Sequence, residues 1–208
     1  DDAMRTYERG LRIAVAQEGP PRPGAADMHV GMSDLFRERN DLATASQHLR
    51  ASRELGDENG LPQNPYRWRV ASARIQQAGG ELASAMELLD EAERLYVGDF
   101  SADVRPVAAV RARVWIAQGN LSEAWGWARE HSVTAAVELS YLHEFEHATL
   151  ARLLLAQGMR DHSDDSIGEA IELTERLLAA AESGGRNGSA LDSLVVQASR
   201  PNLSGATA

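Results

Sequence analysis

The sequence predicts an all-α protein, a right-handed superhelix of paired helices with about nine helices and no strands. Three observations predict this fold class. The apolar pattern of the chain recurs about every 39 to 40 residues, apolar residues within each repeat are three or four positions apart, and Ala and Leu dominate the predicted helix interiors. A repeat of this length is typical of solenoids, in which each helical hairpin buries its apolar face against its neighbours.

Each repeat is predicted to contain two helices, defined by residues that recur at equivalent positions. The first helix is defined by Met28, Trp68 and Val107, by Gly31, Ala71 and Val110, and by Leu35, Ile75 and Val114. The second helix is defined by Leu42, Leu82 and Leu121, by Ala45, Ala85 and Ala124, and by Leu49, Leu89 and Ala128. The spacing of three and four within both groups places each group on one face of a helix.

The turns between the two helices carry the residues that such a hairpin needs. They are Asn40-Asp41, Gly79-Gly80 and Gly119-Asn120. Gly and Asn tolerate the left-handed conformation that ends a helix, and Asp or Asn can cap the helix that follows. Asn120 and Glu123 also have the spacing of a capping box, in which each side chain satisfies a backbone N–H of the other residue.

The repeat divides residues 1–198 into successive units of a single domain. We place them near residues 1–18, 24–56, 64–96, 104–132 and 137–183, with a partial unit at 189–198. The unit at 137–183 repeats the sequence Ala-Gln-Gly of the preceding unit, and its turn, MRDHSDDS, is predicted to be longer by about seven residues. Residues 199–208 do not continue the repeat and are predicted to be a disordered tail.

Both ends of the repeat array look incomplete, and the chain begins with Asp1 rather than Met. We therefore expect a piece of a longer chain. In a solenoid, an uncapped end exposes the apolar surface that the next repeat would cover. We expect such open ends to favour self-association.

The composition excludes several kinds of enzyme. All 21 basic residues are arginine, because the sequence contains no lysine, and it contains no cysteine either. The chain therefore has no phosphate-binding P-loop lysine, no Schiff-base lysine, no catalytic cysteine, no disulfide and no cysteine-ligated metal site. We predict a protein that is not an enzyme and needs no cofactor.

The charge and the hydropathy of the chain also restrict its partners. The formal net charge is −10 at pH 7, so the chain repels phosphate backbones and anionic lipid, and we expect no direct contact with nucleic acid or a membrane. No segment approaches the about 20 apolar residues that span a bilayer, and the acidic start DDAMRTYERG is unlike a signal peptide. We expect a cytoplasmic protein.

Three segments of the sequence resemble a known family. They are DMHVGMSDLFRERNDLATASQHL, YLHEFEHATLARLLLAQG and, most specifically, the run from LYVGDF to DVRPVAAVRARVWIAQG at 95–119. Over about residues 1–198 the chain resembles the tetratricopeptide-like (TPR-like) sensor region of the MalT-like, ATP-dependent LuxR-type transcriptional regulators. In that family a nucleotide-hydrolysing module precedes the helical region and a LuxR-type helix-turn-helix follows it.

The resemblance implies a role in signal sensing and transcription regulation. The helical region of the family is where an inducer or an inhibitory protein acts to control nucleotide-dependent oligomerisation. We therefore expect a small-molecule inducer or a regulatory protein as partner, with nucleotide binding and DNA binding assigned to other modules of a longer parent chain and to no residue here. A free-standing TPR-like scaffold that binds a peptide or protein is the alternative.

Arginines at equivalent repeat positions are the best candidates for a binding site. Arg74, Arg113 and Arg152 recur every 39 residues in successive first helices, which predicts a line along the concave side. Fork-shaped guanidinium groups suit carboxylate, phosphate or an acidic partner segment. The alternative is that they pair with acidic residues of neighbouring helices. The complete predicted ligand or partner site is Arg67, Arg74, Arg105, Arg113, Arg152, Tyr66 and Tyr141.

The segment HEFEH matches the zinc-peptidase pattern H-E-x-x-H. Its spacing puts His143 and His147 on one helix face, with Glu144 as a potential general base. A third ligand is missing, because Leu153 and Ile167 stand where a histidine or a glutamate would be needed. We predict no metal site, keep the two histidines as low-priority ligands, and keep a zinc hydrolase as a remote alternative. The other histidines, predicted to have packing or surface roles, are His29, His48, His131 and His162.

Overall fold

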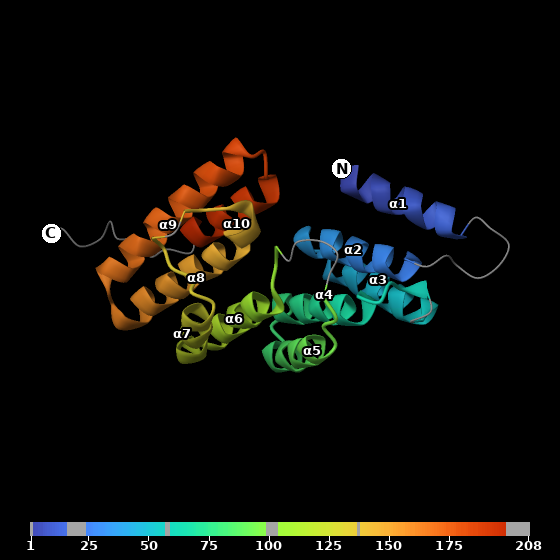
Figure 1. The fold of residues 1–208 in the computed structure, drawn as a ribbon, viewed down its shortest axis with the longest axis horizontal. Helices are drawn as coiled ribbons and strands as arrows, with labels where there is room; N and C mark the ends of the chain where they lie inside the picture. Colours follow the sequence, from blue (N-terminus) through green and yellow to red (C-terminus); the bar gives the residue numbers. More distant parts are fainter. Residues whose placement is uncertain (1, 16–23, 57–58, 99–103, 137, 199–208) are drawn as a thin grey trace. The chain divides into compact units, whose positions relative to one another are not determined.

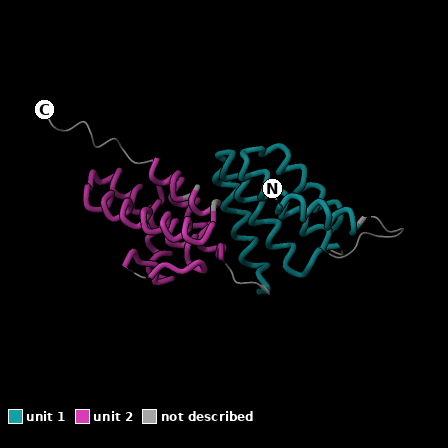
Figure 2. Tube along the Cα trace, turned by 90° about the horizontal axis from the view of Figure 1, so that it is seen from above, with its two compact units in different colours: residues 1–100 teal, residues 101–208 magenta. Residues whose placement is uncertain are grey.

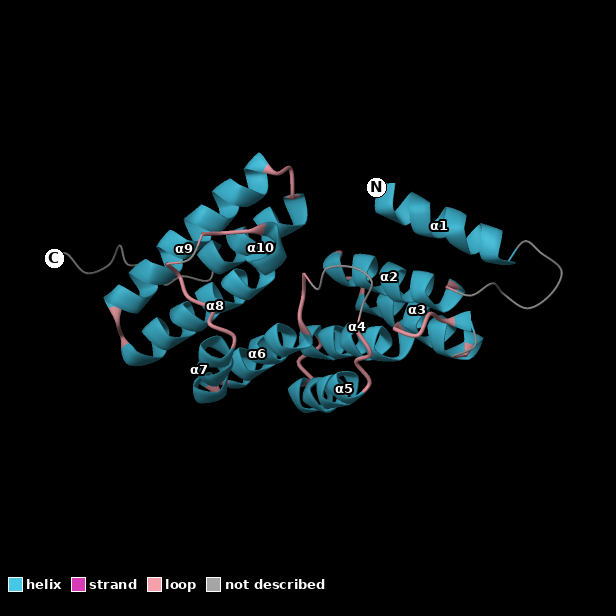
Figure 3. Cartoon of the chain, viewed as in Figure 1, coloured by secondary structure: helices cyan, strands magenta, loops and turns pink. Residues whose placement is uncertain are grey.

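The computed structural model describes residues 2–15, 24–56, 59–98, 104–136 and 138–198. It divides into two compact units, Asp1–Phe100 and Ser101–Ala208 (Figure 2). The described residues form ten α-helices, against the about nine expected, and contain no strand (Figure 3). The all-α helical repeat is thus confirmed. The tail at 199–208 that we predicted to be disordered lies outside the described residues.

Unit 1 consists of two helical hairpins and a leading helix (Figure 1). Its helices are α1 (Asp2–Val15), α2 (Ala25–Glu38), α3 (Leu42–Leu55), α4 (Asn64–Ala78) and α5 (Leu82–Arg94). α2 packs against α3 and α4 against α5, which forms the two hairpins. α4 also packs on α2 and α3, and α1 packs on α2. The pairing of consecutive helices is the arrangement that the repeat predicts.

Unit 2 continues with the same kind of hairpin. Its helices are α6 (Val107–Gln118), α7 (Leu121–Glu130), the short 3₁₀ helix η2 (Tyr141–His143), α8 (Glu144–Asp161), α9 (Asp164–Ser183) and α10 (Asn187–Ala198). α6 pairs with α7, and α8 pairs with α9. α8 also packs on α6 and α7, and α10 packs on α9 and α8. The start of α8 therefore lies close to elements from several parts of this unit.

The repeat is visible in the burial of its small residues. The equivalent alanines Ala45, Ala85 and Ala124 of the second helices are all fully buried. In the first helices, Ala71 and Val110 are buried at equivalent positions. Small side chains at these positions let neighbouring helix backbones approach closely.

The hairpin turns contain the predicted left-handed residues, and the predicted side-chain cap is present in the first of them. Asn40, Gly80 and Gly119 have positive φ angles of 59°, 85° and 78°, the left-handed conformation that ends a helix. Asp41 then caps α3, because its Oδ1 accepts a hydrogen bond from the Thr44 backbone N–H at 3.0 Å. Each turn thus ends one helix and starts the next within a few residues.

The capping box predicted at Asn120 is wrong. The Asn120 backbone N–H donates to the Trp115 carbonyl at 2.9 Å, and the Asn120 side chain donates to Gln118 rather than capping α7. This N–H already closes the end of α6 after the left-handed Gly119, so it is not available to a Glu123 carboxylate. The C-terminal motif of one helix takes precedence over the N-terminal motif of the next.

The long turn predicted after Gly158 is also wrong. α8 continues to Asp161, and only two residues separate it from α9. His162 adopts the left-handed conformation with φ of 53°, and Ser163 caps α9 by accepting a hydrogen bond from the Ser166 N–H at 3.3 Å. A single non-glycine residue therefore ends the helix where we expected a loop.

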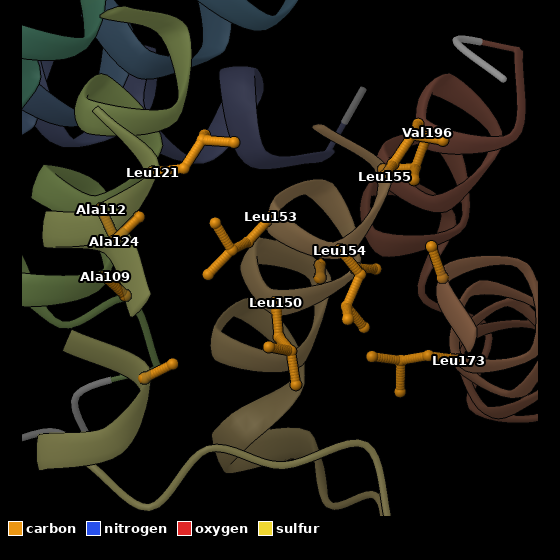
Figure 4. Packing of buried hydrophobic residues seen from close by; sticks show 14 of the residues in the cluster. Ala109, Ala112, Leu121, Ala124, Leu150, Leu153, Leu154, Leu155, Leu173 and Val196 are labelled. Carbon is orange, nitrogen blue, oxygen red and sulfur yellow. The ribbon is translucent and has the colours of Figure 1, made fainter. Parts of the chain in front are cut away.

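The hydrophobic core is larger in unit 2 than in unit 1. In unit 2, one buried cluster combines leucines of α8 and α9, among them Leu150, Leu153 and Leu173, with small residues of α6 and α7 (Figure 4). In unit 1, the buried cluster is Val30, Ala45, Leu49, Ala71 and Ile75, with Phe36 and Trp68 packed against it. The difference comes from α8, which has leucines on several faces because it contacts helices on several sides.

None of the described helices combines the length and the apolar character that crossing a membrane would require.

Candidate functional site

Two of the predicted site arginines in unit 1 bind carboxylates of the neighbouring repeat. Arg74 Nη1 lies 2.6 Å from Asp34 Oδ1, and Arg67 Nη1 lies 3.5 Å from Asp27 Oδ1. Both pairs join α4 to α2 across 40 residues, the length of one repeat. Asp27 also accepts a hydrogen bond from the Leu61 N–H at 2.7 Å. These contacts agree with the alternative interpretation, in which the arginines pair with acidic residues of neighbouring helices. They stabilise the packing of successive repeats.

Arg69 of unit 1 has a similar structural contact. Its Nε donates to Glu91 Oε2 at 2.6 Å, and its Nη1 donates to the Pro65 carbonyl at 2.9 Å. The hydrogen bond and the positive charge of Arg69 lower the pKa of the Glu91 carboxyl below its ordinary value. This pair holds α4 against α5 within one hairpin.

Tyr66 is a packing residue at the start of α4. Only 8% of its surface is exposed, and its ring meets the Tyr96 ring edge-on at a centroid distance of 5.1 Å. An edge-to-face pair of this kind stabilises the contact between the start of α4 and the end of α5. The structure therefore places Tyr66 in the interior rather than on an accessible surface.

Arg113 of unit 2 is held by an aromatic ring and a hydroxyl group. Its Cζ lies 3.8 Å from the centre of the Phe145 ring, and its Nε donates to Thr149 Oγ1 at 2.9 Å. Thr149 is fully buried and also donates to the Phe145 carbonyl at 2.8 Å, which fixes its own position. The guanidinium plane is thus oriented before any ligand arrives, which reduces the entropy that binding would cost.

A second arginine approaches the same ring. Arg105, an exposed residue just before α6, has its Cζ 6.0 Å from the centre of the Phe145 ring. Phe145 is half-buried and is the second residue of α8. The start of α8 therefore brings together two of the predicted arginines, one from α6 and one from the segment before it.

A third arginine lies beside the exposed Tyr141. Tyr141 is 56% exposed in η2, and the Arg186 Cζ lies 5.6 Å from the centre of its ring. Arg186 also binds the Glu144 carboxylate, with Nη2 3.1 Å from Oε1, and Ser189 donates to Glu144 Oε2 at 2.8 Å. Since Glu144 is almost completely buried, this ion pair anchors the turn before α10 to the start of α8.

We call this group the α8 N-terminal cluster, and it consists of Arg105, Arg113, Tyr141, Phe145 and Arg186. All five residues belong to unit 2. Arg105 and Arg113 contact the Phe145 ring, whereas Arg186 contacts the Tyr141 ring and binds the Glu144 carboxylate. The two sets of contacts are joined through the chain, because Glu144 precedes Phe145 directly. The arrangement is suited to bind an anionic group beside an apolar or ring-shaped one.

The sequence identified part of this cluster and missed the rest. Arg105, Arg113 and Tyr141 were predicted, whereas Phe145 and Arg186 were not. Phe145 lies inside the HEFEH segment, where the histidine pattern draws attention, and Arg186 lies in a Gly-rich turn that has no equivalent in the other repeats. Arg152 lies half-buried on α8, about two helical turns after Phe145. Its role as a ligand contact stays a prediction.

The HEFEH segment does not have the geometry of a zinc site. His143 Nδ1 lies 2.6 Å from Glu146 Oε2, His147 Nδ1 lies 2.8 Å from the His143 carbonyl oxygen, and Glu144 is held by Arg186. Within the described part of the chain, no three His, Cys, Asp or Glu side chains lie where they could share a metal ion. These contacts organise the first turn of α8.

The comparison with known families gives one result. The family described as the MalT-like TPR region matches residues 1–206. Searches of curated proteins and of solved structures found no match. Because the family covers almost the whole chain, and the fold is the helical repeat that it requires, the chain belongs to the MalT-like TPR region family.

Proposed function

We propose that this chain is the effector-sensing and protein-interaction region of a LuxR-type transcriptional regulator. The family match over residues 1–206 supports a MalT-like region, and the α8 N-terminal cluster supports a binding role. In this proposal the chain acts in the cytoplasm and catalyses no reaction. Nucleotide hydrolysis and DNA binding belong to other modules of the parent regulator.

The α8 N-terminal cluster is the proposed effector site. The observation that carries the proposal is Arg113, whose guanidinium lies 3.8 Å over Phe145 and is oriented by Thr149. Oriented guanidinium groups bind phosphate and carboxylate with two parallel hydrogen bonds. The rings of Phe145 and Tyr141 offer an apolar surface for the rest of the ligand. A small anionic inducer such as a sugar phosphate matches both features.

Binding would act by selecting one packing of the start of α8. Glu144 and Arg186 connect this start to the turn before α10, and Arg113 connects it to α6. A ligand that contacts Arg105, Arg113 and Tyr141 would therefore favour the arrangement in which these helices are held together. The effect on the equilibrium equals the difference in its affinity for the two arrangements.

Thermal unfolding in the presence of candidate ligands tests this proposal. The panel contains sugars, sugar phosphates, nucleotides and acidic peptides. A ligand at 100 times its Kd adds about 2.7 kcal/mol of stability, which raises Tm by about 5–10 °C for a chain of this size. We expect a saturable rise with sugar phosphates that disappears in Arg113→Gln.

The matched control is Arg160→Gln. Arg160 also lies on α8, but its side chain is 54% exposed and pairs with Asp161 near the other end of the helix. This variant should keep the full rise in Tm. If every member of the panel leaves Tm unchanged, or if Arg160→Gln loses the response as Arg113→Gln does, the small-molecule proposal is wrong.

A protein partner is the second candidate, and two exposed residues favour it. Tyr141 of the cluster and its neighbour Leu142 are 56% and 47% exposed, and large apolar side chains of this kind anchor protein interfaces. An acidic segment of a regulatory protein, or of a partner of a free-standing scaffold, would then meet the arginines. An acidic peptide from the panel would bind, and its affinity would fall in both Tyr141→Ala and Arg113→Gln.

A further inference from the structure

Two histidines form a direct contact inside the α2–α3 hairpin of unit 1. His29 of α2 and His48 of α3 face one another, with their Nδ1 atoms 2.9 Å apart. Their ring centroids are 5.2 Å apart, and the Phe36 ring stacks on His48 at 5.3 Å. Both histidines are half-buried. The sequence predicted packing or surface roles for them and no mutual contact.

The short distance between the two Nδ1 atoms limits how many protons the pair can hold. One Nδ1 must carry the hydrogen that it donates, and the other must offer a lone pair. A first added proton can go to an Nε2 atom without breaking this bond. A second added proton would put hydrogen on both Nδ1 atoms, so two N–H groups and two positive charges would face one another at 2.9 Å.

The surroundings of the pair make a positive charge there unfavourable. Burial lowers the pKa of His29 and His48 below the ordinary value, and the charge of His48 lowers that of His29 further. The Arg39 guanidinium lies 5.9 Å from the Phe36 ring, the same ring that stacks on His48.

Three acidic residues of α2 and of the α2–α3 turn bind groups other than the two histidines. Asp27 and Asp34 of α2 bind Arg67 and Arg74 of α4, and Asp41 caps α3. The other titratable or charged residues on α1, α2 and α3 are partly or fully exposed, and they are Asp2, Arg5, Tyr7, Glu8, Arg9, Arg12, Arg37, Glu38, Arg50, Arg53 and Glu54. Of the α4 arginines, Arg69 binds Glu91. Asp27, Asp34 and Asp41 thus bind groups other than the imidazole rings.

We propose that His29 and His48 form a proton-sensitive clasp that holds α2 and α3 together when at most one added proton is present and releases the hairpin when both rings are charged. The clasp lies in unit 1, and the proposal does not depend on the effector site of unit 2. Release would also loosen α4, because the same helix α2 carries Asp27 and Asp34. Mild acid would thereby be sensed as a change in the packing of successive repeats.

The pair is better described as a proton site than as a metal site. Two nitrogen ligands are fewer than the three or four protein ligands of a typical zinc site. Among the residues that the structure describes, no third His, Cys, Asp or Glu joins them. The distance between the two Nδ1 atoms is therefore that of a hydrogen bond, in which one proton lies between the rings, and not that of a shared metal ion.

The sign of the pH effect follows from the direction of the shifts. A histidine whose folded-state pKa is lowered binds its proton more readily in the unfolded chain, so stability is complete above the unfolded pKa of about 6.5. Stability is lost as pH falls from there toward the folded-state pKa values. Over this interval, a proton that binds only the open state raises the equilibrium constant for opening about tenfold for each unit by which the pH falls.

Hydrogen exchange of the unaltered chain, followed residue by residue with NMR, tests the clasp without any substitution. The amide protection of α3 is compared with that of α5 at pH 7 and pH 5, after correction for the intrinsic exchange rate. We expect the opening constant of α3 to rise at least about tenfold more than that of α5. An equal change in the two helices overturns the proposal.

The variant His48→Asn tests the role of the second proton. Its amide stands where Nδ1 stood and can still hydrogen-bond His29, but it takes up no proton. We expect the acid-induced loss of α3 protection to shrink by at least about tenfold and the pKa of His29 to rise. His29→Asn is the reciprocal variant, and His162→Asn, on the exposed end of α8 with φ of 53°, is the matched control. A pH response of either pair variant that equals that of the unaltered chain contradicts the clasp.

Discussion

Arg74 and Arg113 occupy the same position of two successive repeats, yet they have different partners. Arg74 binds the Asp34 carboxylate at 2.6 Å and so joins α4 to α2. Arg113 lies over the Phe145 ring at 3.8 Å and donates to Thr149 at 2.9 Å. The repeat thus determines where an arginine stands, and the residues of the neighbouring helix determine what it does.

The two units also differ in the size of their hydrophobic cores. Unit 1 is held by a small buried cluster together with ion pairs between successive first helices, whereas unit 2 has a large leucine core. Both units expose large apolar side chains, among them Tyr96 and Val97 in unit 1 and Tyr141 and Leu142 in unit 2. The ion pairs of Arg67, Arg69 and Arg74 join helices of unit 1, which is why the proposed binding site is in unit 2.

The largest expected effect is in the core of unit 2. Leu153 of α8 is fully buried in the cluster that it forms with residues of α6, α7 and α9. Leu153→Ala should therefore lower the free energy of unfolding by about 2–5 kcal/mol. Urea unfolding measures it. Leu194→Ala is the matched control, because Leu194 is 45% exposed on α10 and its loss should cost about 0.5 kcal/mol or less. Equal costs for the two variants would contradict the core described here.

The second effect concerns the ion pair of unit 1. A double-mutant cycle of Arg74→Gln and Asp34→Asn should give a coupling energy of about 1 kcal/mol, because the side chains are 12% and 31% exposed. The coupling should weaken in high salt, which screens charges. Arg37, whose Nε lies 3.5 Å from Asp34 Oδ1, is unchanged in all four proteins of the cycle, so the coupling energy refers to Arg74 and Asp34. No coupling at low salt would mean that the pair does not stabilise the repeat packing.

The third effect is the corresponding cycle in unit 2. Arg113→Gln with Phe145→Leu should give a coupling energy of about 0.5–1 kcal/mol from the cation–π contact. This coupling should persist in salt better than that of Arg74 and Asp34, since a ring quadrupole at 3.8 Å is a short-range partner. A stronger salt dependence in unit 2 than in unit 1 would reverse the comparison.

The smallest effect distinguishes the helix caps of the two units. The hydrogen bonds from Thr44 lower the pKa of Asp41, so its contribution to stability is present above its unfolded pKa of about 3.9 and is lost as pH falls through the lower folded value. The Ser163 cap of α9 has no such titration. Asp41→Ser should keep the α3 cap and remove this acid sensitivity. Acid unfolding curves that coincide for the two chains would contradict this assignment.

Periodicity predicted the fold well because burial in a repeat protein is a local, recurring property. The buried alanines at 45, 85 and 124 and the left-handed Asn40, Gly80 and Gly119 follow from it directly. The lengths of turns did not follow, because His162 can adopt a left-handed conformation that a non-glycine residue seldom takes. Local residue choice therefore decided where α8 ends.

The partners of the site residues could be predicted only in part. The positions of Arg74 and Arg113 follow from the repeat, but their partners Asp34 and Phe145 depend on how neighbouring helices are rotated. Arg186 reaches Glu144 from 42 residues away and belongs to no repeat position. The contact of His29 with His48 likewise depends on helix rotation, since the two are 19 residues apart and share no motif.

The most direct test of the account compares ligand binding in two matched variants. The probe is a hexose 6-phosphate, titrated by calorimetry into the unaltered chain, Arg113→Gln and Arg74→Gln. We predict that Arg113→Gln weakens binding at least about tenfold, whereas Arg74→Gln lowers stability and leaves Kd within about twofold. An equal loss of affinity in both variants, or a loss only in Arg74→Gln, would contradict the assignment of binding to unit 2.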